Sequence, residues 1–391
     1  MAVARSRFVV ASALSAFFAA LLVLTGCQGV ANSPAAPQAA VASAFVYVVS
    51  SPSGNNVAIN AFSAESTGQL TPVPGSPFTA NVTSIAANRN YLFGTDGTNI
   101  YSFSIAANGA LTQVSSMSIR QFNPNGVVAE LFLDGTGATL YAVHLQIDGA
   151  NQGYDSFRVD HSTGVLTFLG ATFTGCCSTG ALNFMANNVY GFTSDCFHGD
   201  PTVALYKRND DGTLTSVPSG LDNSPDPTHL CPESVAPGPT GTLAVAFGAL
   251  GGPGVETTPP QEGGVVLAVY SVDSSGSLTT SSTVANMPQT DFGGRLMISP
   301  SGKFLASGGL GLEVFHFNGG DPITPFTGLL TKDQIDQFGQ MAWDNENNLY
   351  ALSQSANKLS VFTVTATNAT PAPGSPYMIT NPIAIAVVPS K

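Results

Sequence analysis

The chain alternates apolar and polar residues in short runs, and one pattern of such runs returns at intervals. Its clearest copy covers residues 269–279, Val-Tyr-Ser-Val-Asp-Ser-Ser-Gly-Ser-Leu-Thr. Alternation over four to eight residues predicts a strand, and a turn containing Gly followed by Leu-Thr predicts a second strand paired with the first. The repeated unit is therefore a β-hairpin.

The hairpin is recognised by an aromatic residue, a Gly six positions later and a Leu eight positions later. Three further copies, which keep this spacing only in part, begin at Phe157, Phe315 and Phe362. Strand repeats separated by roughly 40 to 65 residues are typical of the blades of a propeller. Four copies keep the full spacing: Phe62/Gly68/Leu70, Phe103/Gly109/Leu111, Tyr206/Gly212/Leu214 and Tyr270/Gly276/Leu278.

Each repeat has room for two strands before the hairpin, so a blade has four antiparallel strands. The pattern predicts an all-β, seven-bladed β-propeller without helices in the mature fold. The predicted second strands are residues 45–49, 91–94, 140–143, 189–192, 243–247, 304–307 and 349–352. The predicted innermost strands are residues 84–87, 130–133, 182–186, 234–237, 295–299, 340–343 and 383–388.

The two ends of this array complement each other. The first strand, at residues 45–49, lacks an innermost partner, and the last, at residues 383–388, has no blade after it. We expect the C-terminal strand to join the N-terminal blade, which closes the ring and leaves no long open edge. Prolines in residues 70–78 and 371–377 place those segments at the outer edge, where a missing N–H removes no ladder hydrogen bond.

The N-terminus has the pattern of an export signal. Arg5 and Arg7 precede an apolar run over residues 8–23, which ends in Leu-Thr-Gly-Cys at residues 24–27. This ending resembles a bacterial lipobox, and the resemblance implies lipidation of Cys27. We therefore divide the chain into a signal peptide (1–27), an Ala/Pro-rich tether (28–43) and the propeller (44–391), and expect export, with anchoring in the cell envelope at the outer membrane or periplasm.

Composition narrows the set of partners. The 391 residues carry a formal net charge of −12, and only 9% are charged. An acidic surface repels phosphate backbones, so no nucleic-acid partner is expected. We expect a monomer whose partners are the membrane, through its lipid anchor, and a small-molecule, carbohydrate or protein ligand.

The hairpin run Gly-x-Leu-Thr-Pro-Val-Pro-Gly-Ser-Pro-Phe at residues 68–78 and the turn Ser-Pro-Ser-Gly-Lys-Phe at 299–304 resemble the seven-bladed lactonase family that includes bacterial 6-phosphogluconolactonases. The family places His and Glu at the start of innermost strands. Glu130, in Ala-Glu-Leu, matches the glutamate, and Arg295 occupies an equivalent position. The matching histidine is missing, so the resemblance is specific for the scaffold and weak for the activity.

Two functions remain open at this point. In the first, the protein is a binding scaffold with a degraded catalytic signature; in the second, it hydrolyses lactones with Glu130 as base and Arg295 stabilising the developing charge. Export and scarce basic residues both disfavour a phosphorylated substrate. Further candidates on the ligand-binding face are Asp195, His198, His229, Glu233 and Gln340. We expect His144 to be a surface loop residue, and no metal or cofactor is expected.

Four cysteines remain in the body of an exported protein, and an even number indicates two disulfides. All four fall in predicted loops of one face. We expect one bridge from each of the adjacent pair to the other two, with a zinc site as the minority alternative. The residues are Cys176, Cys177, Cys196 and Cys231.

Overall fold

The computed structural model places every described strand between Val41 and Lys391. Within it the structure describes residues 41–51, 57–146, 152–175, 181–185, 190–195, 202–217, 225, 230–249, 264–290, 294–331 and 338–391. The predicted signal peptide with Cys27 and most of the predicted tether lie outside these residues. No described helix is long and apolar enough to cross a membrane.

The described strands group into seven antiparallel sheets. The first contains β31 (Pro382–Pro389), β1 (Ala44–Ser50), β2 (Ala58–Ala64), β3 (Leu70–Pro72) and β4 (Phe78–Thr79). The second contains β5 (Ser84–Ala87), β6 (Tyr91–Thr95), β7 (Asn99–Ile105) and β8 (Leu111–Ser118). The third contains β9 (Gly126–Leu133), β10 (Thr139–Gln146), β11 (Gln152–Val159) and β12 (Leu166–Gly175).

The other sheets repeat this order. The fourth contains β13 (Asn183–Phe184), β14 (Tyr190–Asp195), β15 (Thr202–Arg208) and β16 (Leu214–Val217). The fifth contains β17 (Leu230–Pro237), β18 (Thr242–Ala249), β19 (Val265–Val272), β20 (Leu278–Thr280) and β21 (Gln289–Thr290). The sixth contains β22 (Arg295–Ile298), β23 (Phe304–Gly309), β24 (Gly311–His316) and β25 (Thr324–Pro325). The seventh contains β26 (Phe338–Trp343), β27 (Asn348–Ser353), β28 (Lys358–Val364), β29 (Ala369–Pro371) and β30 (Tyr377–Met378).

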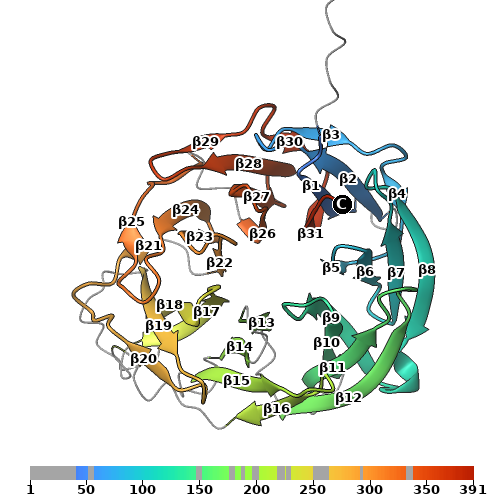
Figure 1. Cartoon of the computed structure of the whole chain (residues 1–391), viewed down its shortest axis with the longest axis horizontal. Helices are drawn as coiled ribbons and strands as arrows, with labels where there is room; N and C mark the ends of the chain where they lie inside the picture. Colours follow the sequence, from blue (N-terminus) through green and yellow to red (C-terminus); the bar gives the residue numbers. More distant parts are fainter. Residues whose placement is uncertain are drawn as a thin grey trace, which may run out of the picture. The chain divides into compact units, whose positions relative to one another are not determined.

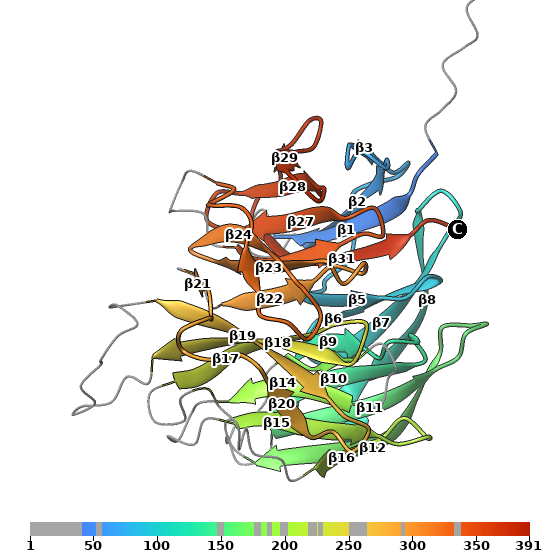
Figure 2. The ribbon, with the colours of Figure 1, turned by 60° about the vertical axis from the view of Figure 1, so that its left-hand side comes forward.

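The sheets surround a central axis, with β31, β5, β9, β13, β17, β22 and β26 innermost (Figure 1). Seen obliquely, successive sheets stack against one another (Figure 2). The predicted all-β propeller is therefore confirmed. One short 3-10 turn, η1 (Ile119–Gln121), is the only helical element among the described residues.

The closing strand lies where the sequence places it. β31 pairs antiparallel with β1 over the length of both strands, from Ala44 opposite Pro389 to Ser50 opposite Pro382. The proline-bearing segment also lies where expected, because β3 and β4 pair only with β2, at the outer edge of the first sheet. Ring closure by the C-terminal strand is thus confirmed.

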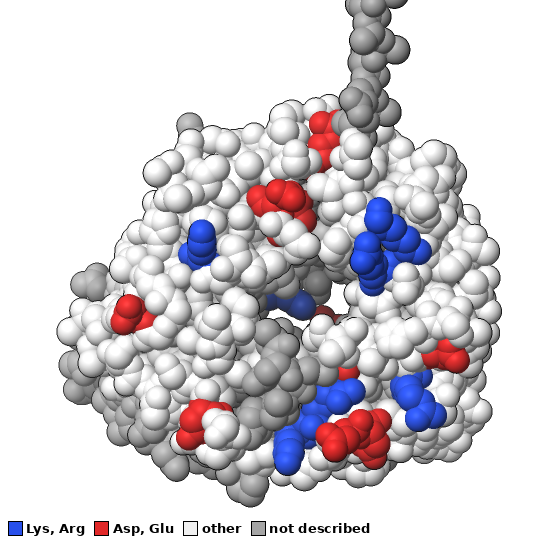
Figure 3. Space-filling view, in the orientation of Figure 1, with Lys and Arg blue, Asp and Glu red and all other residues white. Residues whose placement is uncertain are grey.

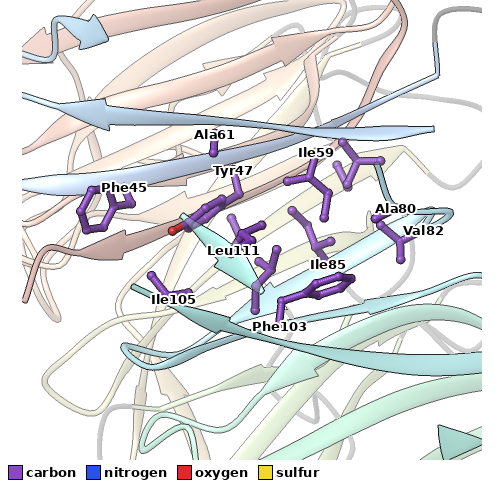
Figure 4. Close-up of a cluster of buried hydrophobic side chains, with 14 of the residues drawn as sticks. Phe45, Tyr47, Ile59, Ala61, Ala80, Val82, Ile85, Phe103, Ile105 and Leu111 are labelled. Carbon is purple, nitrogen blue, oxygen red and sulfur yellow. The ribbon is translucent and has the colours of Figure 1, made fainter. Parts of the chain in front are cut away.

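Seven clusters of buried apolar side chains fill the spaces between neighbouring sheets. In the cluster between the first and second sheets, Tyr47 and Ile59 pack with Ile85 and Phe103 (Figure 4). Another cluster joins the seventh sheet to the first, where Val46 packs with Tyr350. Because each sheet buries both faces, the propeller is held mainly by apolar burial between sheets.

The turn glycines at positions 68, 109, 164 and 212 of the repeated hairpin sit on the preceding sheet of the ring. Gly109 has φ of 83°, and a Cβ built on it would lie 2.5 Å from the Phe45 ring. Its carbonyl accepts a hydrogen bond of 2.9 Å from the Tyr47 hydroxyl. Gly212 repeats the arrangement with Thr139 and Tyr141 of the third sheet. The Gly in the sequence repeat is therefore needed both for its backbone conformation and for contact between sheets.

We expect Gly109→Ala to destabilise the protein through both effects. An L-residue in the left-handed region costs about 1–2 kcal/mol, and overpacking costs about 1–3 kcal/mol more. Gly319 is the matched control, because its φ is 68° and nothing lies within 4 Å of a built Cβ. Urea unfolding of both variants measures the difference. Equal losses of stability would show that the contact with Phe45 contributes nothing.

Candidate functional site

The innermost strands line a cavity of about 590 Å³ on the central axis. Its walls come from β5, β9, β22, β26 and β31, which belong to five different sheets. In the space-filling view the propeller is hollowed at its centre, and both basic and acidic atoms are visible inside the hollow (Figure 3). A volume in the range of roughly 300–1,000 Å³ is typical of small-molecule sites.

Three of the residues predicted from sequence line this cavity together. Glu130 comes from β9, Arg295 from β22 and Gln340 from β26. β9 and β22 lie in the third and sixth sheets, which are not neighbours in the ring. The ring therefore brings together side chains that lie 165 residues apart in the chain.

Glu130 and Arg295 form an ion pair in the cavity. Arg295 Nη1 lies 3.4 Å from Glu130 Oε1, and the two side chains are 22% and 31% exposed, for Arg295 and Glu130 respectively. This is long for a charge-assisted hydrogen bond, which is usually about 2.7–2.9 Å. The pair is thus loose and partly solvated, so either group has the freedom to reach a ligand.

A second carboxylate of the lining is already fully used by the fold. Asp134 Oδ2 accepts a hydrogen bond of 2.9 Å from Arg208 Nε, and its side chain is 0% exposed. Its Oδ1 accepts bonds from Thr136 and from the Ala138 N–H. Asp134 therefore fastens the turn between β9 and β10, and Glu130 is the acidic group that the cavity presents.

Other predicted residues lie elsewhere. Glu233 is in β17 and does not line the cavity; its carboxyl end packs on Gly248, and this partial burial raises the pKa of Glu233. Asp195 ends β14, and its side chain lies outside the described residues. His198, His229, Cys176, Cys177 and Cys196 also lie outside them. Cys231 lies in β17 and is buried, with 4% exposure.

The prediction that His144 is a surface loop residue is wrong. It lies within β10 with its ring fully buried, and its Nδ1 is 3.1 Å from Asp155 Oδ1 on the neighbouring strand. The edge of its ring contacts Phe173 at a centroid distance of 5.7 Å. An ionisable residue is rarely fully buried unless it is paired. Sequence reasoning missed the burial of His144 because its partner, Asp155, comes from another strand.

The described residues contain no group of three or more His, Cys, Asp or Glu that could hold a metal ion. The chemistry that the described cavity offers is that of the Glu130 carboxylate, the Arg295 guanidinium and the Gln340 amide, in a wall that also contains apolar side chains and the hydroxyl-bearing residues Thr83 and Ser84. Such a set recognises polar oxygen atoms, and a carboxylate beside a guanidinium can also activate water and stabilise an oxyanion.

We expect the Glu130–Arg295 pair to contribute little to stability, since partly exposed pairs contribute about 0.2–1 kcal/mol. A double-mutant cycle with Glu130→Gln and Arg295→Gln, followed by urea unfolding, measures the coupling. The control is the Asp134–Arg208 pair, where Arg208→Gln leaves a buried carboxylate without its cation and should cost about 3–5 kcal/mol. A coupling free energy above about 2 kcal/mol for Glu130–Arg295 would instead show that the pair stabilises the fold.

No protein-family model matches the chain. No curated protein matches it either.

Solved structures do match over most of the chain. A candidate 6-phosphogluconolactonase from Bacteroides fragilis is 15% identical, with a TM-score of 0.59, and the match covers 90% of this chain and 100% of that one. A similar protein from Bacteroides uniformis is 14% identical, with a TM-score of 0.61 and coverage of 88% and 99%. The periplasmic gluconolactonase of Pseudomonas aeruginosa is 13% identical, with a TM-score of 0.58 and coverage of 89% and 99%. At this level of identity the likeness shows the fold alone, which is a β-propeller.

Proposed function

We propose that this protein binds a small, uncharged, oxygen-rich ring compound, a sugar or sugar lactone, in the central cavity of a seven-bladed ring. The observation that carries the proposal is the meeting of Glu130 and Arg295 across a cavity of about 590 Å³. Carboxylate and guanidinium together can accept and donate hydrogen bonds to the hydroxyl and carbonyl groups of such a ligand. In this reading the propeller is a binding scaffold.

The charge of the site favours an uncharged ligand. Arg295 is the one cation among the described residues that line the cavity, and its charge is offset by Glu130. A phosphorylated ligand requires clustered Arg or Lys to balance its charge. The geometry therefore supports a neutral sugar or lactone over a sugar phosphate.

Lactone hydrolysis is the second candidate, and the closeness of the same two side chains favours it. Glu130 would take a proton from water as the water oxygen attacks the carbonyl carbon. Arg295 would donate hydrogen bonds to the resulting oxyanion. The ring C–O bond then breaks, and the leaving oxygen takes the proton back from Glu130. The periplasmic gluconolactonase with the same fold is consistent with this candidate.

Titration calorimetry of the purified protein with glucose and with glucono-δ-lactone tests the binding proposal. We expect saturable binding that Glu130→Gln weakens about tenfold, because a hydrogen bond to a charged group contributes about 1.5–3 kcal/mol. Glu233→Gln is the matched control, because Glu233 does not line the cavity. Binding that Glu130→Gln leaves unchanged would contradict the proposed site.

Release of acid from the lactone, followed by titration at constant pH, separates the two functions. A scaffold gives no turnover above the uncatalysed rate. A hydrolase gives turnover that falls by about 10²–10⁴ in Glu130→Gln. Arg295→Gln should lower it by a comparable factor.

We also propose that the protein is a lipoprotein of the cell envelope, on the strength of the Leu-Thr-Gly-Cys sequence at residues 24–27. Cys27→Ser should move the protein from the membrane fraction to the soluble fraction and abolish incorporation of labelled palmitate. Cys231→Ser is the control, because it removes a cysteine but leaves the lipobox intact. Equal labelling of Cys27→Ser and wild type would refute lipidation.

Two disulfides in the body of the protein remain part of the proposal. Cys231 is disulfide-bonded and buried, which is consistent with one of them. An exported protein meets the oxidising conditions in which such bridges persist. One bridge would connect the segment that follows β12 to β17, and the other would connect the same segment to the one that follows β14.

A further inference from the structure

The central channel contains a second, smaller cavity beside the first. Its volume is about 280 Å³, and its walls come from β9, β13, β17 and β22. Phe132, Leu133, Arg295 and Met297 line both cavities. The two cavities are thus adjoining chambers of one channel, and the Arg295 side chain stands at their common wall.

The two chambers differ in chemistry. The larger one presents Glu130, Arg295 and Gln340. Apart from Asn183 and Arg295, the described residues that line the smaller one have apolar side chains. The Asn183 amide donates to the carbonyls of Ala181 at 3.2 Å and of Val235 at 3.3 Å, so its donor group is engaged by the fold. The smaller chamber therefore offers apolar contact next to a polar site.

The walls of the smaller chamber are packed from behind. Phe184 stacks on Tyr141 with a centroid distance of 4.9 Å, and Tyr141 is fully buried. Phe132 packs against the same buried cluster, and Leu182 in that cluster is 2% exposed. Side chains held in this way keep their positions when a ligand leaves, so the chamber is largely preformed.

We propose that the natural ligand has two parts: a polar ring held at Glu130 and Arg295, and an apolar aryl or short alkyl substituent that occupies the smaller chamber. This inference rests on the proposed binding function and specifies its ligand class. Phe132 and Met297 line both chambers together with Arg295, so a ring bound at Arg295 can extend its substituent into the smaller chamber. Burial of the substituent supplies affinity that a bare sugar lacks.

The test compares methyl β-D-glucopyranoside with phenyl β-D-glucopyranoside by titration calorimetry on the full-length protein. The two probes share the sugar ring and differ only in the substituent. We expect the phenyl glycoside to bind about tenfold more tightly or better, with a more negative heat-capacity change that reports apolar burial. Phe184→Ala should remove most of this preference and leave the affinity for the methyl glycoside unchanged.

Two further variants keep the result interpretable. Phe132→Leu retains apolar volume, so it tests the aromatic wall if Phe184→Ala fails to fold. Val387→Ala is the matched control, because Val387 lines only the larger chamber. It should preserve the preference for the phenyl glycoside.

The outcomes separate this inference from the function on which it rests. If the methyl glycoside binds and the phenyl glycoside binds no more tightly, the two-part ligand is refuted and the binding function stands. A preference that survives in Phe184→Ala and in Phe132→Leu also refutes it, because the substituent then binds elsewhere. If neither glycoside binds, the two-part ligand is refuted, and if glucose and glucono-δ-lactone do not bind either, both proposals fail.

Discussion

The contact between a hairpin turn and the preceding sheet of the ring, made at Gly68, Gly109, Gly164 and Gly212, is the constraint on which this propeller depends. The turn glycine places its backbone against the beginning of the preceding second strand, where a side chain would collide with Phe45, Tyr91 or Thr139. The tyrosine hydroxyls of Tyr47 and Tyr141 then bond to the glycine carbonyls. The turn glycine thus fixes the distance and the relative position at which neighbouring sheets meet. Apolar clusters fill the remaining space between the sheets.

This packing decides what the centre of the ring looks like. Because neighbouring sheets stack at a fixed spacing, the innermost strands stand around an open axis instead of collapsing onto one another. Side chains on non-neighbouring strands then face each other across a short gap. Glu130 and Arg295 meet there although they belong to the third and sixth sheets, whose strands do not pair with each other.

Three side-chain pairs show how position in the ring separates structural roles from functional ones. Asp134–Arg208 and His144–Asp155 involve carboxylates that are 0% and 2% exposed, and they lie at 2.9 Å and 3.1 Å from their partners. Glu130–Arg295 is longer and more exposed. A buried charge left without its partner is costly, whereas an exposed one is hydrated. Glu130 and Arg295, on the axis, are therefore the two groups that can give up their contact with each other to bind a ligand.

The sequence by itself determined the strand repeat, the innermost position of Glu130, Arg295 and Gln340, and the strand that closes the ring, because these depend on local alternation, turn chemistry and strand order. It could not place His144, whose burial depends on Asp155 in the next strand, and it could not reveal that the channel has two chambers. Only the tertiary structure decided which residues face each other across the axis. Periodicity specifies the face of a strand on which a residue lies, whereas distances between strands of different sheets depend on how all the sheets pack together.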